Sequence, residues 1–160
     1  MTLADSSSIP KLANLFNQYR IFYGEETNLQ VLTDFLKSRF TNKDSVILIA
    51  LETTQIVGFI QLYPSFSSVQ MRKIWILNDL FVSTGFRRKN VTRNLMEAAK
   101  KYAKEIGALR IDLATQISNI FAQNLYESMG YIKNESFFHY SLPIKPSICL
   151  NLFERMPSKR

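Results

Sequence analysis

The residues with the clearest capacity for chemistry lie around a basic loop in the middle of the chain. A strand-like run, 74–82, enters this short polar loop, and the loop opens a long amphipathic helix. The first N–H groups of a helix have no partner inside it and carry partial positive charge, so such a start binds anions. Full positive charges are added by Arg87, Arg88, Lys89 and Arg93. The sequence therefore predicts a site for a ligand that bears a diphosphate.

Apolar periodicity predicts the elements that must position this loop. Apolar residues that recur at three and four positions indicate helices, and continuous or alternating apolar runs indicate strands. Helices are expected over 9–23, 29–40, 91–106 and 119–129, with a short further helix over 147–156. Strands are expected over 46–51, 56–63, 71–82, 108–113 and 137–142, with a loop over 64–68. This order predicts an α/β fold, an α+β sandwich around one mixed central sheet with helices on both faces.

Size and composition limit the classes of protein. A chain of 160 residues is most simply one domain. Cys149 is the single cysteine, which excludes an internal disulfide and a cysteine-based metal cage, and no metal site is expected. No apolar run could span a membrane, and the residues after Met1 do not form a secretory signal. We therefore expect a soluble, cytoplasmic protein.

The net charge of +7 suits a nucleic acid, a membrane surface or an acidic cofactor. Nucleic-acid binding usually needs a basic stripe with exposed aromatic residues. Here the densest basic cluster lies at one helix start, which favours a local anion site over a groove along a nucleic-acid backbone.

Two segments carry recognisable motifs. Residues 80–96 read Leu-Phe-Val-Ser-Thr-Gly-Phe-Arg-Arg-Lys-Asn-Val-Thr-Arg-Asn-Leu-Met, and residues 119–131 read Asn-Ile-Phe-Ala-Gln-Asn-Leu-Tyr-Glu-Ser-Met-Gly-Tyr. The first resembles the acetyl-CoA-binding motif of the GNAT superfamily, the Gcn5-related N-acetyltransferases. The second is similar to that family's Asn-x-x-Ala-x-x-Leu-Tyr-x-x-x-Gly-Phe/Tyr signature. The resemblance implies one GNAT-like domain over 2–143, a sheet of about six or seven strands, and a C-terminal extension over 144–160.

The basic loop departs from the family's Arg/Gln-x-x-Gly-x-Gly/Ala pattern, because Asn90 and Thr92 replace both small residues. Glycine allows the backbone to approach a pyrophosphate closely and to adopt positive φ. Asn90 is the best tolerated replacement, since asparagine visits the left-handed region more readily than most residues and can cap a helix. Thr92 crowds the helix start with a branched Cβ, although its hydroxyl could donate to a phosphate oxygen.

The resemblance implies that acetyl-CoA is the cofactor and that Tyr126 is the general acid for the departing CoA thiolate. From periodicity alone, Tyr126 is instead a core tyrosine on the inner face of its helix. Asn119 is open between an N-cap and a hydrogen bond to the pantetheine arm. The residues implied to bind the cofactor are Leu80, Phe81, Val82, Arg87, Arg88, Lys89, Asn90, Val91, Thr92, Arg93, Asn119 and Tyr126.

The general base is open between several residues. Many GNAT relatives place a carboxylate near Asn78 and Asp79, often acting through water. Asn78 cannot take a proton, which leaves Asp79, yet adjacent strand residues face opposite sides, so a structural role for Asp79 stays open. Glu25 and Glu26 lie where relatives often bind the acceptor. Together with Asn78 they are candidate substrate-binding residues, and the alternative for both glutamates is a solvated loop.

Three functions are consistent with these observations. The first is an N-acetyltransferase that transfers acetyl directly to a primary amine, more readily a small polyamine, amino acid or aminoglycoside-like molecule than a protein. The second is a catalytically degraded acyl-CoA-binding or sensing protein, which the substitutions at Asn78, Asn90 and Thr92 favour. The third, a nucleic-acid partner, rests on net charge alone. A homodimer through the apolar tail 148–153 is left open.

Overall fold

The computed structural model describes residues 1–144, which fall into two compact units. The first unit is Met1–Ala114, and the second begins at Thr115. The predicted single domain over 2–143 stays a prediction.

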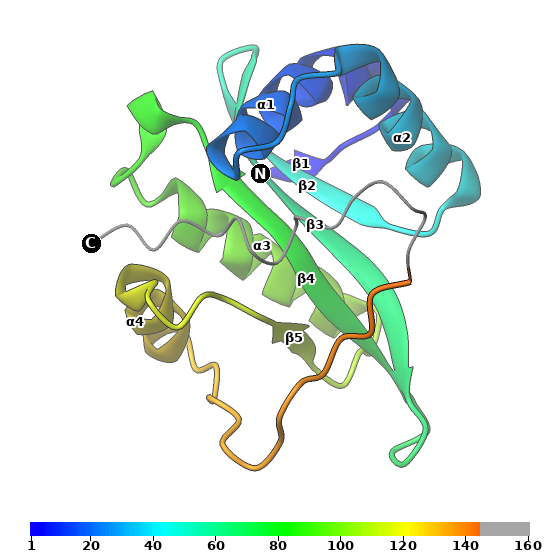
Figure 1. Cartoon of the computed structure of the whole chain (residues 1–160), viewed down its shortest axis with the longest axis vertical. Coiled ribbons are helices and arrows are strands. Elements are labelled where there is room, and N and C mark those ends of the chain that lie inside the picture. The colour runs from blue at the N-terminus through cyan, green and yellow to red at the C-terminus, as the bar shows by residue number, and fades with distance from the viewer. Residues whose placement is uncertain (145–160) are drawn as a thin grey trace. The chain divides into compact units, whose positions relative to one another are not determined.

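The first unit is built on one mixed sheet of five strands that lie side by side in chain order (Figure 1). Antiparallel pairing joins β1 to β2, β2 to β3 and β3 to β4, whereas β5 joins β4 in parallel. The strands are β1 Thr2–Leu3, β2 Val46–Glu52, β3 Gln55–Ser67, β4 Arg72–Val82 and β5 Ile111–Leu113. The long β3–β4 hairpin forms the centre of this sheet.

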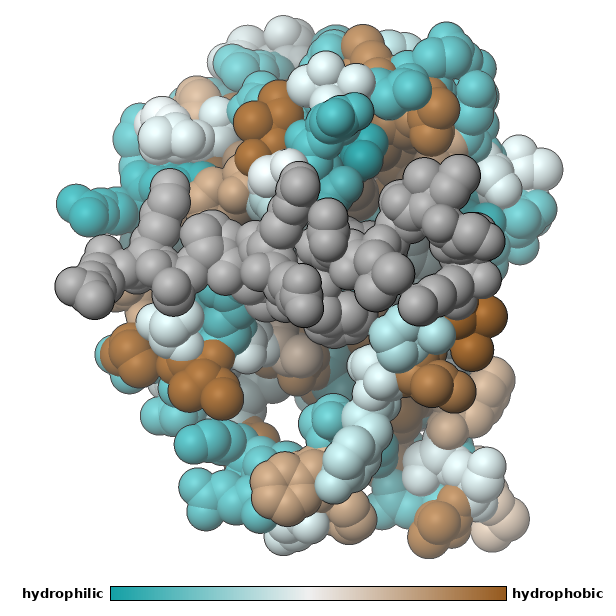
Figure 2. All heavy atoms as spheres, in the orientation of Figure 1, coloured by the Kyte–Doolittle hydropathy of each residue, from teal (hydrophilic) through white to brown (hydrophobic). Residues whose placement is uncertain are grey.

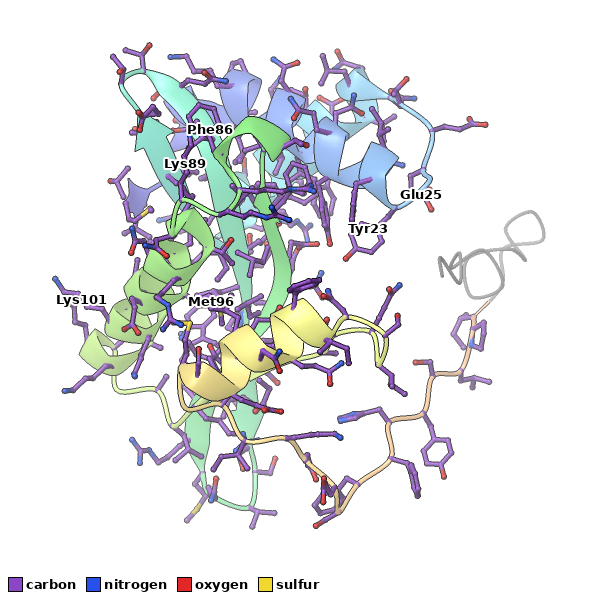
Figure 3. All side chains as sticks on the ribbon, turned by 90° about the vertical axis from the view of Figure 1, so that its left-hand side faces the viewer. Tyr23, Glu25, Phe86, Lys89, Met96 and Lys101 are labelled. Atoms are coloured by element: carbon purple, nitrogen blue, oxygen red, sulfur yellow. The ribbon has the colours of Figure 1, made fainter. Side chains whose placement is uncertain are left out.

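Helices cover both faces of the sheet (Figures 1 and 3). On one face lie α1 (Ile9–Phe22), which follows a 3-10 turn at Ser6–Ser8, and α2 (Leu29–Asn42). Their apolar sides pack with inward residues of three strands into one core cluster. The strand members are Ile47, Ile49, Ile56, Phe59 and Phe81. Because side chains alternate along a strand, the other face is left for a different helix.

That second face is covered by α3 (Val91–Glu105), which packs closely on the sheet. Gly58 makes the close approach possible, since a Cβ there would lie 3.1 Å from Leu95 Cδ1 and 3.1 Å from the Phe81 carbonyl oxygen. Met96 faces the sheet and is fully buried, whereas Lys101 points outward (Figure 3). The amphipathic pattern of α3 therefore fixes both its position and its orientation.

The second unit contains one helix within the described residues, α4 (Ile120–Ser128). Asn119 caps its start, because its Oδ1 accepts from the Ala122 N–H at 3.2 Å. Gly130, with φ +88°, follows its end. Residues 131–144 form neither helix nor strand.

The four predicted helices that fall in residues 1–144 are confirmed, with ends shifted by up to two residues. Four of the predicted strands are confirmed in place, although β5 is shorter than expected. The predicted loop over 64–68 is wrong in large part, because β3 continues to Ser67. The helix expected over 147–156 lies outside the described residues.

The predicted strand over 137–142 is wrong, since no strand forms there. Phe137 and Phe138 are 73% and 88% exposed, so their apolar pattern packs against no partner that would fix a strand. The described residues therefore form five strands rather than the expected six or seven.

On the face drawn in Figure 2, apolar side chains gather in separate small patches among hydrophilic ones.

Candidate functional site

The loop before α3 has the backbone of an anion site. A 3-10 turn at Thr84–Phe86 leads into two left-handed residues, Arg88 with φ +62° and Asn90 with φ +60°. The predicted left-handed conformation of Asn90 is confirmed. The predicted cap is not found, because the Asn90 side chain makes no capping hydrogen bond. The first turn of α3 is therefore left with donors that can point at an anion.

Arg87 holds this loop against β4 and α1. Its Nε donates to the Val82 carbonyl oxygen at 3.1 Å. Its guanidinium carbon lies 5.3 Å from the ring centre of Phe22 and 5.6 Å from that of Phe81. These are cation–π distances, so Arg87 stabilises the loop from the α1 side of the sheet.

The remaining cations lie at the start of α3. Lys89 Nζ is 5.0 Å from the ring centre of Phe86, and the two side chains lie together in Figure 3. Arg88 is exposed, whereas Val91, Thr92 and Arg93 are half-buried in the first turn of the helix. Charge therefore gathers where the backbone donors of α3 begin.

Among the described residues, no strand pairs with the outer edge of β4 just before this loop. β5 pairs only with Trp75, Ile76 and Leu77, while β4 continues to Val82. The Ser83 N–H donates to the Val57 carbonyl at 2.9 Å, which continues the register of β3 with β4. Antiparallel partners exchange hydrogen bonds at alternate residues, so Leu80 and Val82 direct their backbone groups away from β3. This edge could receive an amide-containing chain.

A β-bulge lies at the point where β5 stops pairing. Gln61 pairs with Asp79 and the next residue, Leu62, pairs with Leu77, so Asn78 is an extra residue on β4. The bulge brings neighbouring side chains together, because Asn78 Nδ2 donates to Asp79 Oδ2 at 3.1 Å. Strict alternation fails at a bulge, so the two side chains are in contact although Asn78 is exposed and Asp79 is buried.

Asp79 is a buried carboxylate, only 7% exposed. Burial raises the pKa of Asp79 above its ordinary value, and hydrogen bonds from Asn78 and Tyr19 oppose that rise. A raised pKa brings a carboxylate closer to the proton affinity that general-base catalysis requires.

Polar groups that the sequence analysis did not single out surround Asp79. Gln61, its cross-strand partner, is fully buried; Nε2 donates to Ser45 Oγ at 3.0 Å, and Oε1 has no partner within the described part of the chain. Burial, and then the charge of Asp79, raise the pKa of Tyr63 to about 12. Gln61 could have been identified from the sequence, because a glutamine inside an apolar strand is unusual. Tyr19 could not, because it fits the apolar pattern of α1.

The acidic loop after α1 contains one ion pair and one exposed carboxylate. Glu25 Oε2 lies 3.7 Å from Arg20 Nη2, and Glu26 is exposed. Tyr23 lies beside Glu25 at the end of α1 (Figure 3). Burial, and then the charge of Asp79, raise the pKa of Tyr23, which places Tyr23 within electrostatic reach of the buried carboxylate.

In the second unit, Tyr126 is half-buried on α4, with its ring centre 5.9 Å from that of Tyr131. The predicted N-cap role of Asn119 is confirmed by its bond to Ala122. In residues 1–144 no group of three or more His, Cys, Asp and Glu side chains could hold a metal ion. No helix in the same range is long and apolar enough to cross a membrane.

Comparisons with known proteins agree on one family. A family model described as the acetyltransferase (GNAT) family matches residues 9–131. The chain is 48% identical to "Uncharacterized N-acetyltransferase YhfO" of Bacillus subtilis over 88% of this chain and 95% of that protein. It is 30% identical to "Probable acetyltransferase" of Haemophilus influenzae over 87% of this chain and 95% of that protein. A crystal structure of a probable acetyltransferase, 40% identical, superposes with a TM-score of 0.86 over 90% of this chain and 97% of that one.

Proposed function

The chain belongs to the GNAT family of N-acetyltransferases, and from that premise we propose that it transfers acetyl from acetyl-CoA directly to the primary amine of a small molecule. The observation that carries the proposal is the buried Asp79 carboxylate, three residues before the end of the strand that leads into the anion-binding loop. A proton acceptor and an anion site thus lie along one continuous segment.

The residues of the first unit fit the cofactor. The N–H groups at the start of α3, with Arg88 and Lys89, would hold the diphosphate, since helix starts and cations both favour phosphate. The backbone groups of Leu80 and Val82 would pair with the amides of the pantetheine arm. Acetyl-CoA supplies an acyl group activated as a thioester. A crystal structure of a predicted acetyltransferase with acetyl-CoA, 17% identical, shares the fold.

Asp79 would take the proton from the acceptor. An amine reaches the protein mainly as an ammonium ion and must lose a proton before it can attack a carbonyl carbon. The raised pKa of Asp79 and its slight exposure suit that step. Gln61 Oε1, on the same face of the sheet, has no hydrogen-bond partner among residues 1–144, which supports a ligand or water that donates a hydrogen bond there.

Tyr126 would return a proton to the CoA thiolate as it leaves. This role rests on its place in the Leu-Tyr-x-x-x-Gly-Tyr motif of α4. Asn119 Oδ1 accepts the capping bond, so its Nδ2 is the group that would donate to the pantetheine arm. No covalent acyl-enzyme is part of this proposal, and both substrates bind together before transfer.

The names of more distant relatives support a small acceptor. "L-ornithine N5-acetyltransferase NATA1" of Arabidopsis thaliana is 29% identical over 80 residues, half of this chain and 35% of that protein. "Streptothricin acetyltransferase" of Escherichia coli is 31% identical over 98 residues, 61% of this chain and 53% of that protein. Both names specify a small molecule as the acceptor, and we propose the same class here.

Thermal melting with acetyl-CoA is the first test. At about 100 times its dissociation constant, a ligand adds roughly 2.7 kcal/mol to folding stability, or a rise in Tm of about 5–10 °C for a chain of this size. An amine screen with Tyr126→Phe as control would then follow CoA release. A Tm that does not move at millimolar acetyl-CoA would contradict the proposal and favour a degraded GNAT fold.

A further inference from the structure

The Asp79 carboxylate receives hydrogen bonds from two side chains on different elements. Asn78, at the bulge of β4, donates to Oδ2 at 3.1 Å. Tyr19, on α1, donates its hydroxyl to the same carboxylate. Both bonds favour the ionised form, whereas burial opposes it. The bond from Tyr19 comes from a helix, so it ties the carboxylate to an element other than its own strand.

The ring of Tyr19 is held by four aromatic neighbours. Its centre lies 5.5 Å from Phe16, 5.0 Å from Tyr23, 5.8 Å from Phe59 and 5.7 Å from Phe81. Phe59 and Phe81 are a cross-strand pair on the face that carries Asp79. Aromatic contacts on several sides leave the ring little rotational freedom, so the hydroxyl has a fixed position.

We propose that Tyr19 is a positioning residue, which aims the Asp79 carboxylate with its hydroxyl and keeps it ready to accept a proton. The inference rests on the proposed function. In the proton-transfer step one N–H bond of the ammonium breaks and one O–H bond forms on Asp79, which leaves a neutral amine and a neutral carboxyl group. Tyr19 keeps its own proton throughout.

Other titratable groups face Asp79 without donating to it in this arrangement. The charge of Asp79 acts on Tyr23, which directly follows α1, and on Tyr63 on β3, and Arg39 and Asp44 act in turn on Tyr63. With a pKa of about 12, Tyr63 stays neutral near neutral pH. Removing the Tyr63 hydroxyl should therefore leave the ionisation of Asp79 unchanged, and Tyr63→Phe is a matched control for Tyr19→Phe.

The first measurement is kcat/KM against pH for the wild type, Tyr19→Phe and Tyr63→Phe. Phenylalanine keeps the aromatic packing and removes only the hydroxyl. Loss of a hydrogen bond to a charged group should lower kcat/KM of Tyr19→Phe about tenfold on the acidic side of the profile. On the alkaline plateau the loss should be much smaller, and Tyr63→Phe should keep the wild-type profile shape. An equal loss at every pH in Tyr19→Phe would indicate a structural role and overturn the inference.

The second measurement needs no acceptor. The carboxyl carbon of Asp79 can be titrated by NMR in aspartate-labelled protein and assigned with Asp79→Asn. We expect the midpoint to move to higher pH in Tyr19→Phe and to stay in place in Tyr63→Phe. Identical midpoints in the wild type and Tyr19→Phe would refute the positioning role, whether or not an acceptor is known. A wild type that binds acetyl-CoA but acetylates no amine would instead count against the proposed function.

Discussion

At the scale of single residues, Asp79 carries opposing demands. Burial makes the carboxylate a stronger proton acceptor, and the same burial penalises its ionised form. Because the pKa in the folded state lies above the unfolded value, the folded state binds the proton more tightly. Stability therefore falls as pH rises from the unfolded pKa through the folded pKa, and at neutral pH the ionised group costs stability.

Asp79→Asn is expected to lower kcat by about 10²–10⁴-fold, the usual contribution of a general base. At pH 7 its Tm should exceed that of the wild type, with each kcal/mol worth about 2–4 °C. The difference in Tm between Asp79→Asn and the wild type should narrow as pH falls through the folded pKa of Asp79.

Asp112→Asn is the control for the loss of a carboxylate that is not buried. Asp112 lies on β5, and its Oδ1 is 2.9 Å from Arg110 Nε. A lower Tm for Asp79→Asn at pH 7 would contradict the assigned cost of burial.

Asn90 shows how one residue can replace the glycine of a family loop. It adopts φ +60°, which costs most residues roughly 1–2 kcal/mol but costs asparagine less. Asn90→Gly should bind acetyl-CoA as tightly as the wild type or a few-fold tighter, because the strain is removed. Asn90→Val should weaken binding about tenfold, since a branched Cβ is poorly tolerated there. Calorimetric titration with acetyl-CoA compares the two variants. Equal affinities of Asn90→Gly and Asn90→Val would show that the left-handed conformation at residue 90 does not limit binding.

At the scale of elements, the position in which α3 packs on the sheet decides where the N-terminus of α3 lies. Gly58 faces that helix, and an added Cβ would meet Leu95, Phe81 and Val82 at 3.1 Å each. One of those contacts is with backbone, so part of the strand or helix would have to move. The loop that precedes α3 would move with it, and the proposed diphosphate site would be displaced.

Gly58→Val is therefore expected to destabilise the fold by about 1–3 kcal/mol and to weaken acetyl-CoA binding. Gly85→Val is the control for stability alone, because no atom lies within 4 Å of a Cβ built at Gly85, which belongs to the loop before α3. Urea unfolding and acetyl-CoA titration measure both quantities. If Gly58→Val loses stability but binds acetyl-CoA as tightly as the wild type, the position of α3 does not determine the geometry of the proposed diphosphate site.

At the scale of the whole molecule, a net charge of +7 should attract an anionic cofactor. Raising the salt concentration from about 0.05 M to about 0.5 M shortens the screening length severalfold, so the Kd for acetyl-CoA should rise. Arg88→Ala should flatten this dependence, because Arg88 is exposed beside the start of α3. Lys101→Ala is the control, since Lys101 points away from the sheet on the same helix. A Kd that does not change with salt would exclude a main role for these charges.

The cytoplasmic location stays a prediction.

The sequence by itself determined four helices, four of the five strands and the family, and it predicted the anion loop. Each of these depends on local patterns: helical periodicity, cations beside a helix start, and two short motifs. It could not determine the pairing of Asn78 with Asp79, because a bulge depends on the register of two strands. Nor could it identify Tyr19, whose role depends on a helix packing over a strand about sixty residues away along the chain. The strand expected over 137–142 failed for the same reason, since a strand forms only where a partner is present to pair with it.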